Sequence, residues 1–250
     1  MLGRINLLVA LCGAIIACAL APRPASAQDG ADPTAKPAYR WDVTLSLGTA
    51  SSGPAGDIEN AMRASGFDDT SPEISGTGGY AHPFSYTGFN HQGASWVIAA
   101  HYVVNPRYEV GLIVSDAPIG TTYGFHEPFN YIDIHYSART VAPTLSVRLS
   151  DAFYVGVGPA LYTTKASQGY YYAGAVRSYS ATKVGALVEV GASVPVRLRF
   201  FVTASLQYRY VGNATIGPFE SAVPDHPATL PATSVSYNHV FFSVGAGVRF

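Results

Sequence analysis

The sequence predicts an all-β protein, an eight-stranded antiparallel up-and-down β-barrel that spans a membrane. Charged residues make up only 12% of the 250 residues, about half of the share usual in a soluble domain. Residues 240–250 alternate apolar with small or polar side chains, the period of a strand with one apolar and one polar face. Eight such strands can be placed, joined by three short turns and four long loops in strict alternation. An even number of strands with this asymmetry is typical of membrane barrels.

Charge and hydropathy exclude several classes of protein. The formal net charge of −1 argues against a nucleic-acid partner, which would require a basic face. After the N-terminus, no stretch approaches the roughly 18 apolar residues of a membrane-spanning helix. We expect no cofactor, since the sequence has no Gly-rich phosphate loop and its loop histidines lack metal-ligand spacing. These histidines are His82, His91, His126 and His226.

The N-terminus has the pattern of a secretory signal peptide at residues 1–27. Arg4 precedes an apolar segment at residues 7–21, and Ala25-Ser26-Ala27 is a small-residue cleavage site. Both cysteines lie in this segment, so cleavage would leave a chain without a disulfide. The alternative is lipoprotein processing at Cys18, which ends the run Ile15-Ile16-Ala17-Cys18.

The mature chain begins with a polar lead-in at residues 28–39, and the barrel domain covers residues 40–250. Its first strand is expected at residues 41–47, with apolar side chains outward. A short helix is predicted at residues 54–65 of the first long loop, because Ile58, Ala61, Met62 and Ser65 share one face and Gly66 can end the helix. We expect this helix to pack on the barrel mouth, with a binding lid as the alternative.

The other strands follow from the same alternation and from turn residues between them. They are expected at residues 94–103, 108–115, 153–161, 183–191, 200–209 and 240–250, with a fourth strand that ends at residue 149. The long loops are residues 51–90, 116–131, 163–180 and 211–236, and the third of them contains Tyr170, Tyr171 and Tyr172.

Aromatic residues cluster at both ends of these strands, as two membrane-interface girdles would require. The inner girdle is predicted at Trp41, Tyr102, Tyr108, Phe153, Phe200 and Phe250. The outer girdle is predicted at Tyr131, Tyr136, Tyr162, Tyr179, Tyr208 and Tyr237.

The last strand resembles the closing strand of an outer-membrane β-barrel. In that family, a terminal phenylalanine preceded by alternating apolar residues is the signal that the assembly machinery reads. Here these residues are Phe242, Val244, Ala246, Val248 and Phe250.

Residues 40–250 as a whole are similar to the small eight-stranded barrels that include the OmpA membrane domain, OmpX and OmpW. The resemblance implies a monomer in the bacterial outer membrane, exported by the cleaved signal peptide. Its partners would be outer-membrane lipid and the barrel assembly machinery.

Seven charged residues fall on inward positions of the strands. An eight-stranded barrel has room for little beyond its own side chains, and buried charges must pair. We therefore expect a salt-bridge network that plugs the lumen, with a conducting pore as the alternative. Arg249 and Asp42 are expected to pair across the seam where the last strand meets the first. The seven are Asp42, Glu109, Arg148, Lys183, Glu189, Arg209 and Arg249.

Pro143 and Pro159 are unusual because proline cannot donate to a strand ladder. Each lies eight residues from Asp151, so a hairpin centred there would place them opposite each other, roughly 19 Å above the inner edge. One hypothesis is a weak spot in the barrel wall that admits lipid or apolar ligands. The alternative is two tolerated bulges.

His135 and Ser137 lie on one face of the fourth strand. This pair resembles the His-x-Ser motif of PagL-type lipid A deacylases, in which a Glu follows about a dozen residues later. That position holds Leu149 here. A histidine base with a serine nucleophile also needs an orienting acid, and Glu127 and Asp133 are near in sequence without matching the motif.

Three functions follow from these features. The first is a structural or surface-interaction role, in which the outer loops contact a surface ligand. The second is a carrier for small apolar molecules through the wall at the two prolines. The third, with the weakest motif, is a lipid-modifying enzyme that uses His135 and Ser137.

Overall fold

A computed structural model of the chain describes residues 39–51, 53–67, 85–87, 95–125, 131–168, 177–220 and 229–250. Outside these residues lie the predicted signal peptide, most of the predicted lead-in, the loop histidines named above and the three clustered tyrosines. Within the described part, no helix has the length and hydropathy needed to cross a membrane.

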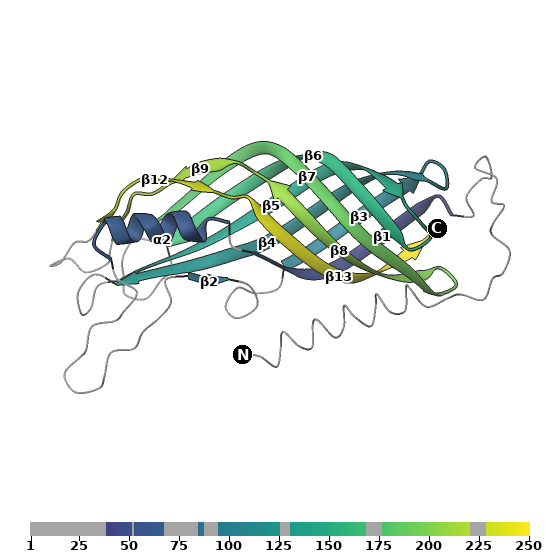
Figure 1. Cartoon of the computed structure of the whole chain (residues 1–250), viewed down its shortest axis with the longest axis horizontal. Coiled ribbons are helices and arrows are strands. Elements are labelled where there is room, and N and C mark those ends of the chain that lie inside the picture. The colour runs from purple at the N-terminus through teal and green to yellow at the C-terminus, as the bar shows by residue number, and fades with distance from the viewer. Residues whose placement is uncertain are drawn as a thin grey trace, which may run out of the picture.

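The described elements are thirteen strands and one helix (Figure 1). They are β1 (Trp41–Ala50), α2 (Ala55–Ala64), β2 (Ser85–Thr87), β3 (Ser95–Val103), β4 (Tyr108–Phe125), β5 (Tyr131–Arg148), β6 (Phe153–Gln168), β7 (Ser178–Arg197), β8 (Phe200–Tyr210), β9 (Asn213–Ile216), β10 (Phe219–Glu220), β11 (Thr229–Leu230), β12 (Thr233–Ser236) and β13 (His239–Arg249).

Eight of these strands form a closed antiparallel ring, which confirms the predicted barrel. Its order is β1, β3, β4, β5, β6, β7, β8 and β13, and β13 returns to pair with β1. The closing register places Asp42 opposite Arg249 and Leu47 opposite Val244. Closure leaves no open edge in the ring, which a sheet in lipid requires. The short strand β2 adds to β4 beyond the ring.

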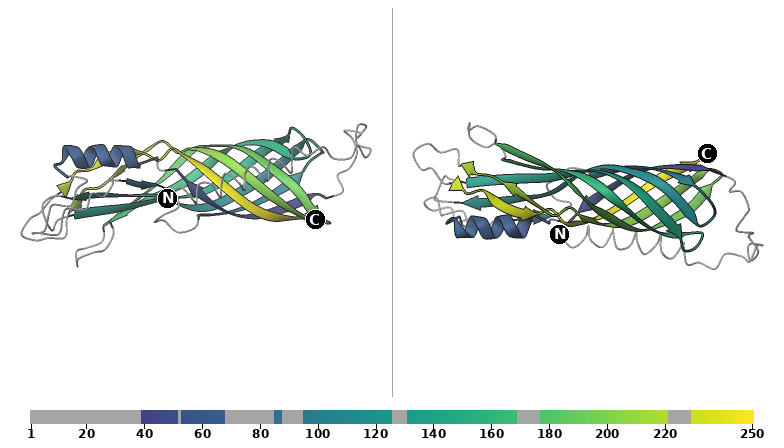
Figure 2. Two further views of the ribbon diagram at one scale, coloured as in Figure 1. Left: turned by 60° about the horizontal axis from the view of Figure 1, so that its bottom comes forward. Right: turned by 90° about the horizontal axis from the view of Figure 1, so that it is seen from above.

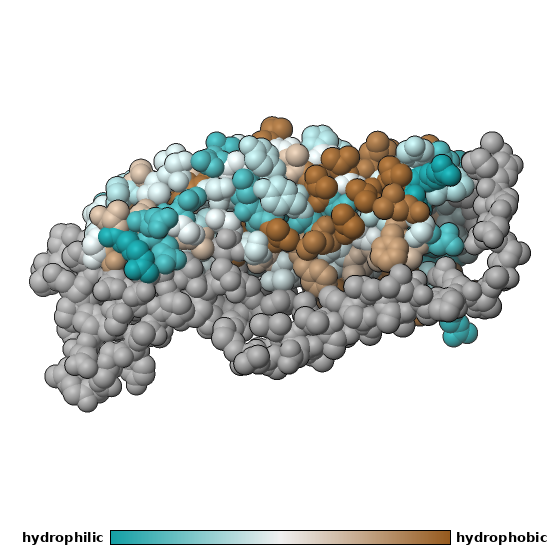
Figure 3. All heavy atoms as spheres, in the orientation of Figure 1, coloured by the Kyte–Doolittle hydropathy of each residue, from teal (hydrophilic) through white to brown (hydrophobic). Residues whose placement is uncertain are grey.

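One half of the barrel contains the C-terminal residue Phe250, and we call it the belt half. It has the outward apolar side chains that the sequence predicts to face lipid, and we call this apolar surface the belt. Large apolar side chains point outward there, as in β1, where Leu45 and Leu47 are exposed by 59% and 61%. In the space-filling view, apolar side chains gather over this half, and polar ones cover the half that carries α2 (Figure 3). The belt is therefore confined to one part of the molecule.

Four of the six residues predicted for the inner aromatic girdle point outward and are about half exposed, namely Trp41, Tyr108, Phe200 and Phe250. The outer girdle was predicted largely wrongly. Only Tyr208 among the described members lies outward and exposed. Tyr136, Tyr162 and Tyr237 are instead fully buried inside the molecule, and Tyr179 packs partly buried against the same core.

Four strands continue well beyond the belt, so most of the described residues in the loops predicted at residues 116–131 and 163–180 belong to strands. β4 and β5 have 18 residues each, β6 has 16 and β7 has 20. The loop predicted at residues 211–236 likewise contains the short pairs β9–β12 and β10–β11. These extensions form an outer half that projects from the barrel (Figure 2).

The polarity of the strands inverts where they leave the belt, which is why the apolar-outward pattern stopped early. In β5, Val141 and Leu145 point outward, and Thr140 and Thr144 point inward. Farther from the turn, the same strand points apolar side chains inward and polar ones outward. The inward residues are Ile132, Ile134, Tyr136 and Ala138, and the outward ones are Asp133, His135, Ser137 and Arg139.

Helix α2 confirms the predicted helix. It begins after Pro54 and ends at Ala64, with Ser65 as its C-cap. Gly66 follows with φ of +82°, a backbone conformation that favours glycine at a helix end. Ile58 and Met62 are fully buried. The helix lies against β4 and β12, and the carboxylate of Asp57 accepts a hydrogen bond from the Ser236 backbone N–H at 2.7 Å. It is thus a packed part of the core.

The outer half encloses an apolar core of its own, between the extended sheet, α2 and the β9–β12 pair (Figure 1). Burial raises the pKa of the Tyr237 phenol well above its ordinary value, so this tyrosine stays neutral in the core. The core residues include Ile58, Met62, Phe67, Ile119, Ile132, Ile134, Tyr136, Ile216, Phe219, Leu230, Val235 and Tyr237.

Candidate functional site

The charged residues of the lumen lie in the belt half and are deeply buried. Asp42, Glu109 and Glu189 are each 4% exposed, and Arg209 is not exposed at all. An unpaired charge at such a depth would cost several kcal/mol. The structure pairs them in two groups.

The lower group joins β1, β3, β4 and β5 at the end of the barrel that contains the C-terminal residue Phe250. Asp42 Oδ1 lies 3.0 Å from Nδ1 of His101. The Arg148 guanidinium donates through Nε to Glu109, and its Nη2 atom lies 3.7 Å from Asp42. One arginine therefore serves two carboxylates that come from different strands.

The upper group centres on Gln207 of β8. Its amide donates to Glu189 Oε1 at 3.1 Å, and its Oε1 accepts two hydrogen bonds from Arg209, at 3.0 and 2.6 Å. Arg209 also donates to Thr140 and lies 4.2 Å above the ring centre of Phe241. A neutral amide thus links the buried carboxylate and the buried guanidinium.

Two of the seven predicted lumen charges stand apart from these groups. The predicted ion pair of Arg249 with Asp42 is wrong, although their backbones are paired. Arg249 lies instead 4.8 Å above the ring of Phe201 and donates to Ser193 Oγ at 3.5 Å. The side-chain partners of Asp42 are instead His101 and Arg148. Lys183 of β7 lies level with Tyr162, at the outer end of the barrel.

These side chains nearly fill the lumen of the belt half. The cavity that Asp42, His101, Glu109, Glu189 and Gln207 help to line has a volume of about 30 Å³. That is room for one or two water molecules.

Two buried histidines were missed by the sequence analysis. His101 is 7% exposed and His239 is 2% exposed. The signal for His101 was present, because it lies between the outward Ala100 and Tyr102. Its room comes from Gly111 on the neighbouring strand, where a Cβ atom would lie 2.1 Å from His101 Cδ2.

Asp42, His101 and Glu109 also have the composition of a metal site. Their ligand atoms lie within 4.8 Å of one another, and all three residues are buried. Arg148 contacts both carboxylates, so a cation already offsets part of their charge. A divalent metal ion would have to displace that guanidinium.

His135 makes contacts other than the expected pair with Ser137. Its Nε2 lies 3.2 Å from Asp133 Oδ2, and its Nδ1 lies 2.8 Å from Thr121 Oγ1. Ser137 shares the outward face and lies opposite Lys165. The hydroxyl at His135 belongs to Thr121, which is fully buried.

Pro143 and Pro159 lie at an interruption between β5 and β6. The strands pair Val141 with Leu161 and Leu145 with Val157, and this register sets the two prolines opposite each other. Both are exposed on the lipid side. The ladder between the two strands breaks over residues 142–144 and 158–160.

The interruption is a close contact of the two backbones. A Cβ atom built on Gly158 would lie 1.8 Å from the carbonyl oxygen of Pro143. The inward positions beside it are the small Ala142 and Ala160. The wall is thus short of hydrogen bonds here but closed.

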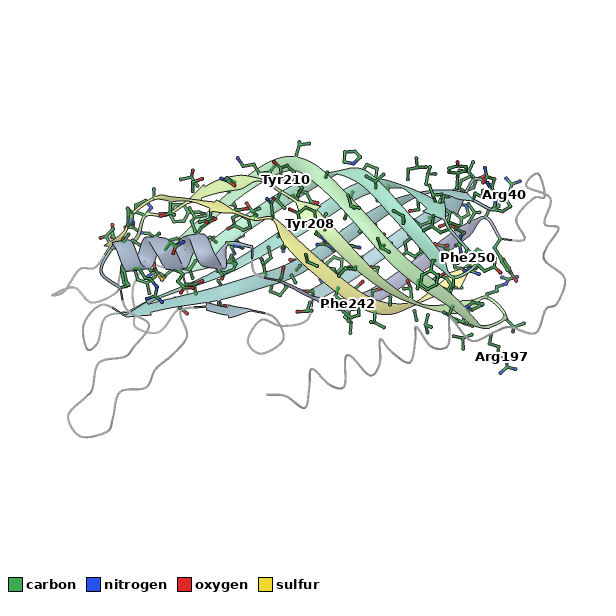
Figure 4. All side chains as sticks on the ribbon, in the orientation of Figure 1. Arg40, Arg197, Tyr208, Tyr210, Phe242 and Phe250 are labelled. Atoms are coloured by element: carbon green, nitrogen blue, oxygen red, sulfur yellow. The ribbon has the colours of Figure 1, made fainter. Side chains whose placement is uncertain are left out.

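The apolar residues of the expected assembly signal all occupy outward positions of β13 or follow it. Phe242 and Phe250 lie at the two ends of the belt in this strand (Figure 4). The residues are Phe242, Val244, Ala246, Val248 and Phe250.

No known protein-family model matches the chain, and no curated protein matches it in sequence. Among solved structures, it is similar to the outer-membrane protein OprG from Pseudomonas aeruginosa, with a TM-score of 0.50 and 11% identity, over 85% of this chain and 96% of that one.

Two further solved structures are more distant in shape. Ail, the attachment invasion locus protein of Yersinia pestis, has a TM-score of 0.40 and 17% identity, over 84% of this chain and 99% of that one. Neisserial surface protein A has a TM-score of 0.40 and 15% identity, over 84% and 97%. At such identities a likeness concerns the fold alone. With its closed ring of eight strands and its lipid-facing belt, the chain has the fold of the small outer-membrane β-barrels.

Proposed function

We propose that this protein is a monomeric, non-conducting barrel of the bacterial outer membrane, whose role is structural or is exerted by surface contacts of its outer half. The observation that carries this proposal is the filling of the molecule along its length. The lumen retains a cavity of about 30 Å³, and an apolar core with α2 closes the outer half. Because the interior is filled by packed side chains, a partner would bind to the outer surface.

Planar-bilayer recording tests the non-conducting part of this proposal. We expect the wild-type protein to give no stable unitary openings, because the Arg209 and Arg148 networks block the axis. Bilayers without protein provide the baseline. Large, stable openings of the wild-type protein would overturn the proposal.

Adhesion of bacteria that express the protein tests the surface part. Tyr170, Tyr171 and Tyr172 come from the segment between β6 and β7, and tyrosines are common at binding interfaces. Replacing all three with serine should reduce adhesion to a layer of mammalian cells. Ser178→Ala with Ser180→Ala, on the same hairpin, is the matched control. Equal adhesion of all three strains would remove the tyrosines from the proposal.

A second candidate function is a carrier of small apolar molecules through the wall. The interrupted ladder between Pro143 and Pro159 favours it, because fewer hydrogen bonds must break there for the strands to part. Replacing both prolines with valine should restore pairing and slow the uptake of an apolar fluorescent dye. Pro195→Val is the control, because Pro195 lies near the end of β7 and not at the interruption between β5 and β6. Unchanged uptake in the double variant would discard this function.

A further inference from the structure

The end of the barrel that carries the C-terminus is rich in arginine. Six of the ten arginines among the described residues lie there. Backbone hydrogen bonds join Arg148 to Arg107 and Arg249 to Arg199, and Arg40 and Arg197 lie at the same end as Phe250 (Figure 4). The six are Arg40, Arg107, Arg148, Arg197, Arg199 and Arg249.

Three of these arginines line one pocket at the mouth of the lumen. The pocket has a volume of about 440 Å³ and is lined by residues of the β3–β4 and β5–β6 turns and the ends of β5, β7 and β13. These elements stand around the ring, so the pocket lies across the barrel axis. Its lining residues are Pro106, Arg107, Arg148, Leu149, Ser150, Asp151, Pro195 and Arg249.

The positive charge of this pocket exceeds its negative charge. Arg148 is held by Glu109. Arg249 contacts Phe201 and Ser193, and the Arg107 side chain has no ion pair within the described residues. Asp151 supplies one carboxylate to the lining. The pocket lining therefore has three guanidinium groups and one carboxylate, and neither Arg107 nor Arg249 forms an ion pair within the described residues.

We propose that this pocket binds a multiply charged oxyanion, such as a polycarboxylate or a polyphosphate. Guanidinium groups bind carboxylate and phosphate oxygens in pairs of parallel hydrogen bonds. Three of them around one axial pocket suit a ligand with two or more anionic groups. In the orientation of the proposed function, this mouth faces the periplasm.

Two sources of anion can reach the mouth. A soluble periplasmic anion would enter along the axis, and the headgroup of an anionic lipid would enter over the rim. Both present the same chemistry to Arg107 and Arg249.

Calorimetric titration of the intact protein in neutral detergent at low salt tests the site. We expect citrate and pyrophosphate to bind and acetate to bind far more weakly. The double variant Arg107→Gln with Arg249→Gln should weaken citrate binding at least about tenfold, because both guanidinium groups lose charge-assisted hydrogen bonds. Arg197→Gln, at the same rim but outside the pocket lining, is the matched control and should change binding less than about twofold.

Two results would overturn the proposal. One is that neither citrate nor pyrophosphate binds to the wild-type protein. The other is that Arg197→Gln weakens binding as much as the double variant does, which would indicate only a diffuse basic rim. Neither result bears on conductance or adhesion, so the proposed function stands or falls separately.

The lipid source is distinguished in nanodiscs of phosphatidylcholine with and without cardiolipin, an anionic lipid whose headgroup has two phosphate groups. Weaker citrate binding in the anionic discs would assign the pocket to lipid headgroups. Equal binding in both discs would assign it to soluble anions. Either result supports the pocket only if the double variant loses the binding.

Discussion

The belt half and the outer half of this molecule use the same strands in opposite ways. In the belt half of β5, Leu145 faces lipid and Thr144 faces the lumen. In the outer half of the same strand, Ile134 is fully buried inside and His135 faces outward. Lipid surrounds the belt half and water surrounds the outer half, so the outward side chains of the strand change from apolar to polar where it leaves the membrane. The comparison teaches that a β-barrel strand can have two interiors: a polar one within lipid and an apolar one within water.

The two interiors are also held together by different forces. Ion pairs and hydrogen bonds around Arg148 and Gln207 fill the belt half. Burial of apolar surface, as at Met62 and Phe219, fills the outer half. Substitutions that are mild in one half should therefore be severe in the other.

The largest expected effect is that of Arg148→Ala in the belt half. It would leave Asp42 and Glu109 buried without their shared cation, at a cost of about 3–5 kcal/mol. Urea unfolding of the protein in lipid bilayers measures the loss. Arg139→Ala is the control in the outer half, where the pair with Asp116 is exposed and should contribute about 0–1 kcal/mol. Similar losses at both sites would contradict the contrast between the halves.

Met62→Ala should destabilise the outer half by about 2–5 kcal/mol, because it leaves a cavity in a close-packed core. The loss should be local, since the belt half has its own hydrogen-bonded ring. Hydrogen exchange should show faster exchange of α2 amides and unchanged exchange in β8. Glu59→Ala, on the exposed side of the helix, is the control. Faster exchange throughout β8 would mean that the two halves unfold together.

A charge placed on the outward face should locate the edge of the belt. Leu145→Arg should cost about 2–4 kcal/mol, the penalty for a charge facing the middle of the membrane. Ser137→Arg, on the same face of β5 beyond the inversion, should cost less than about 0.5 kcal/mol. Urea unfolding in bilayers measures both. Equal penalties would place residue 137 within the membrane as well.

The smallest expected effect is that of Asp57→Asn, at the contact of α2 with β12. It weakens a charge-assisted hydrogen bond to the Ser236 N–H, and we expect a loss of about 0.5–1.5 kcal/mol. The readout is again hydrogen exchange of α2, with Glu59→Gln as the control. If α2 exchanges as in the wild type, its packing alone fixes the helix.

The strands were predictable from sequence in the belt half, where lipid requires apolar residues on the outward face. Lipid demands outward apolar residues, so the alternation from Val43 to Leu47 and from Phe200 to Tyr208 was enough to place strands and faces. The helix at residues 55–64 was predictable from its apolar face. The outer halves of β4 to β7 were not, because their residues obey the opposite rule, and Tyr136 and Tyr162 were assigned to a girdle although they lie in the interior.

For the candidate sites, the sequence predicted which residues point inward or lie opposite each other, but not which residues they contact. Inward charges such as Glu109 and Glu189 followed from the strand period, and the opposed prolines followed from counting residues around Asp151. The partners did not follow. Asp42 contacts His101, and His135 contacts Thr121. Each contact depends on the neighbouring strand and on which side chains fit the available space.

The sequence by itself determined the barrel, its closure by β13 on β1 and the polarity of its membrane-facing wall. These follow from a period of two and from the hydropathy of single residues, which act locally. Only the tertiary structure decided that an apolar core continues the barrel beyond the belt, that Arg148 rather than Arg249 serves Asp42, and that three arginines meet at one mouth. Such arrangements join residues from strands far apart in the chain, so they depend on register, side-chain reach and competition for space.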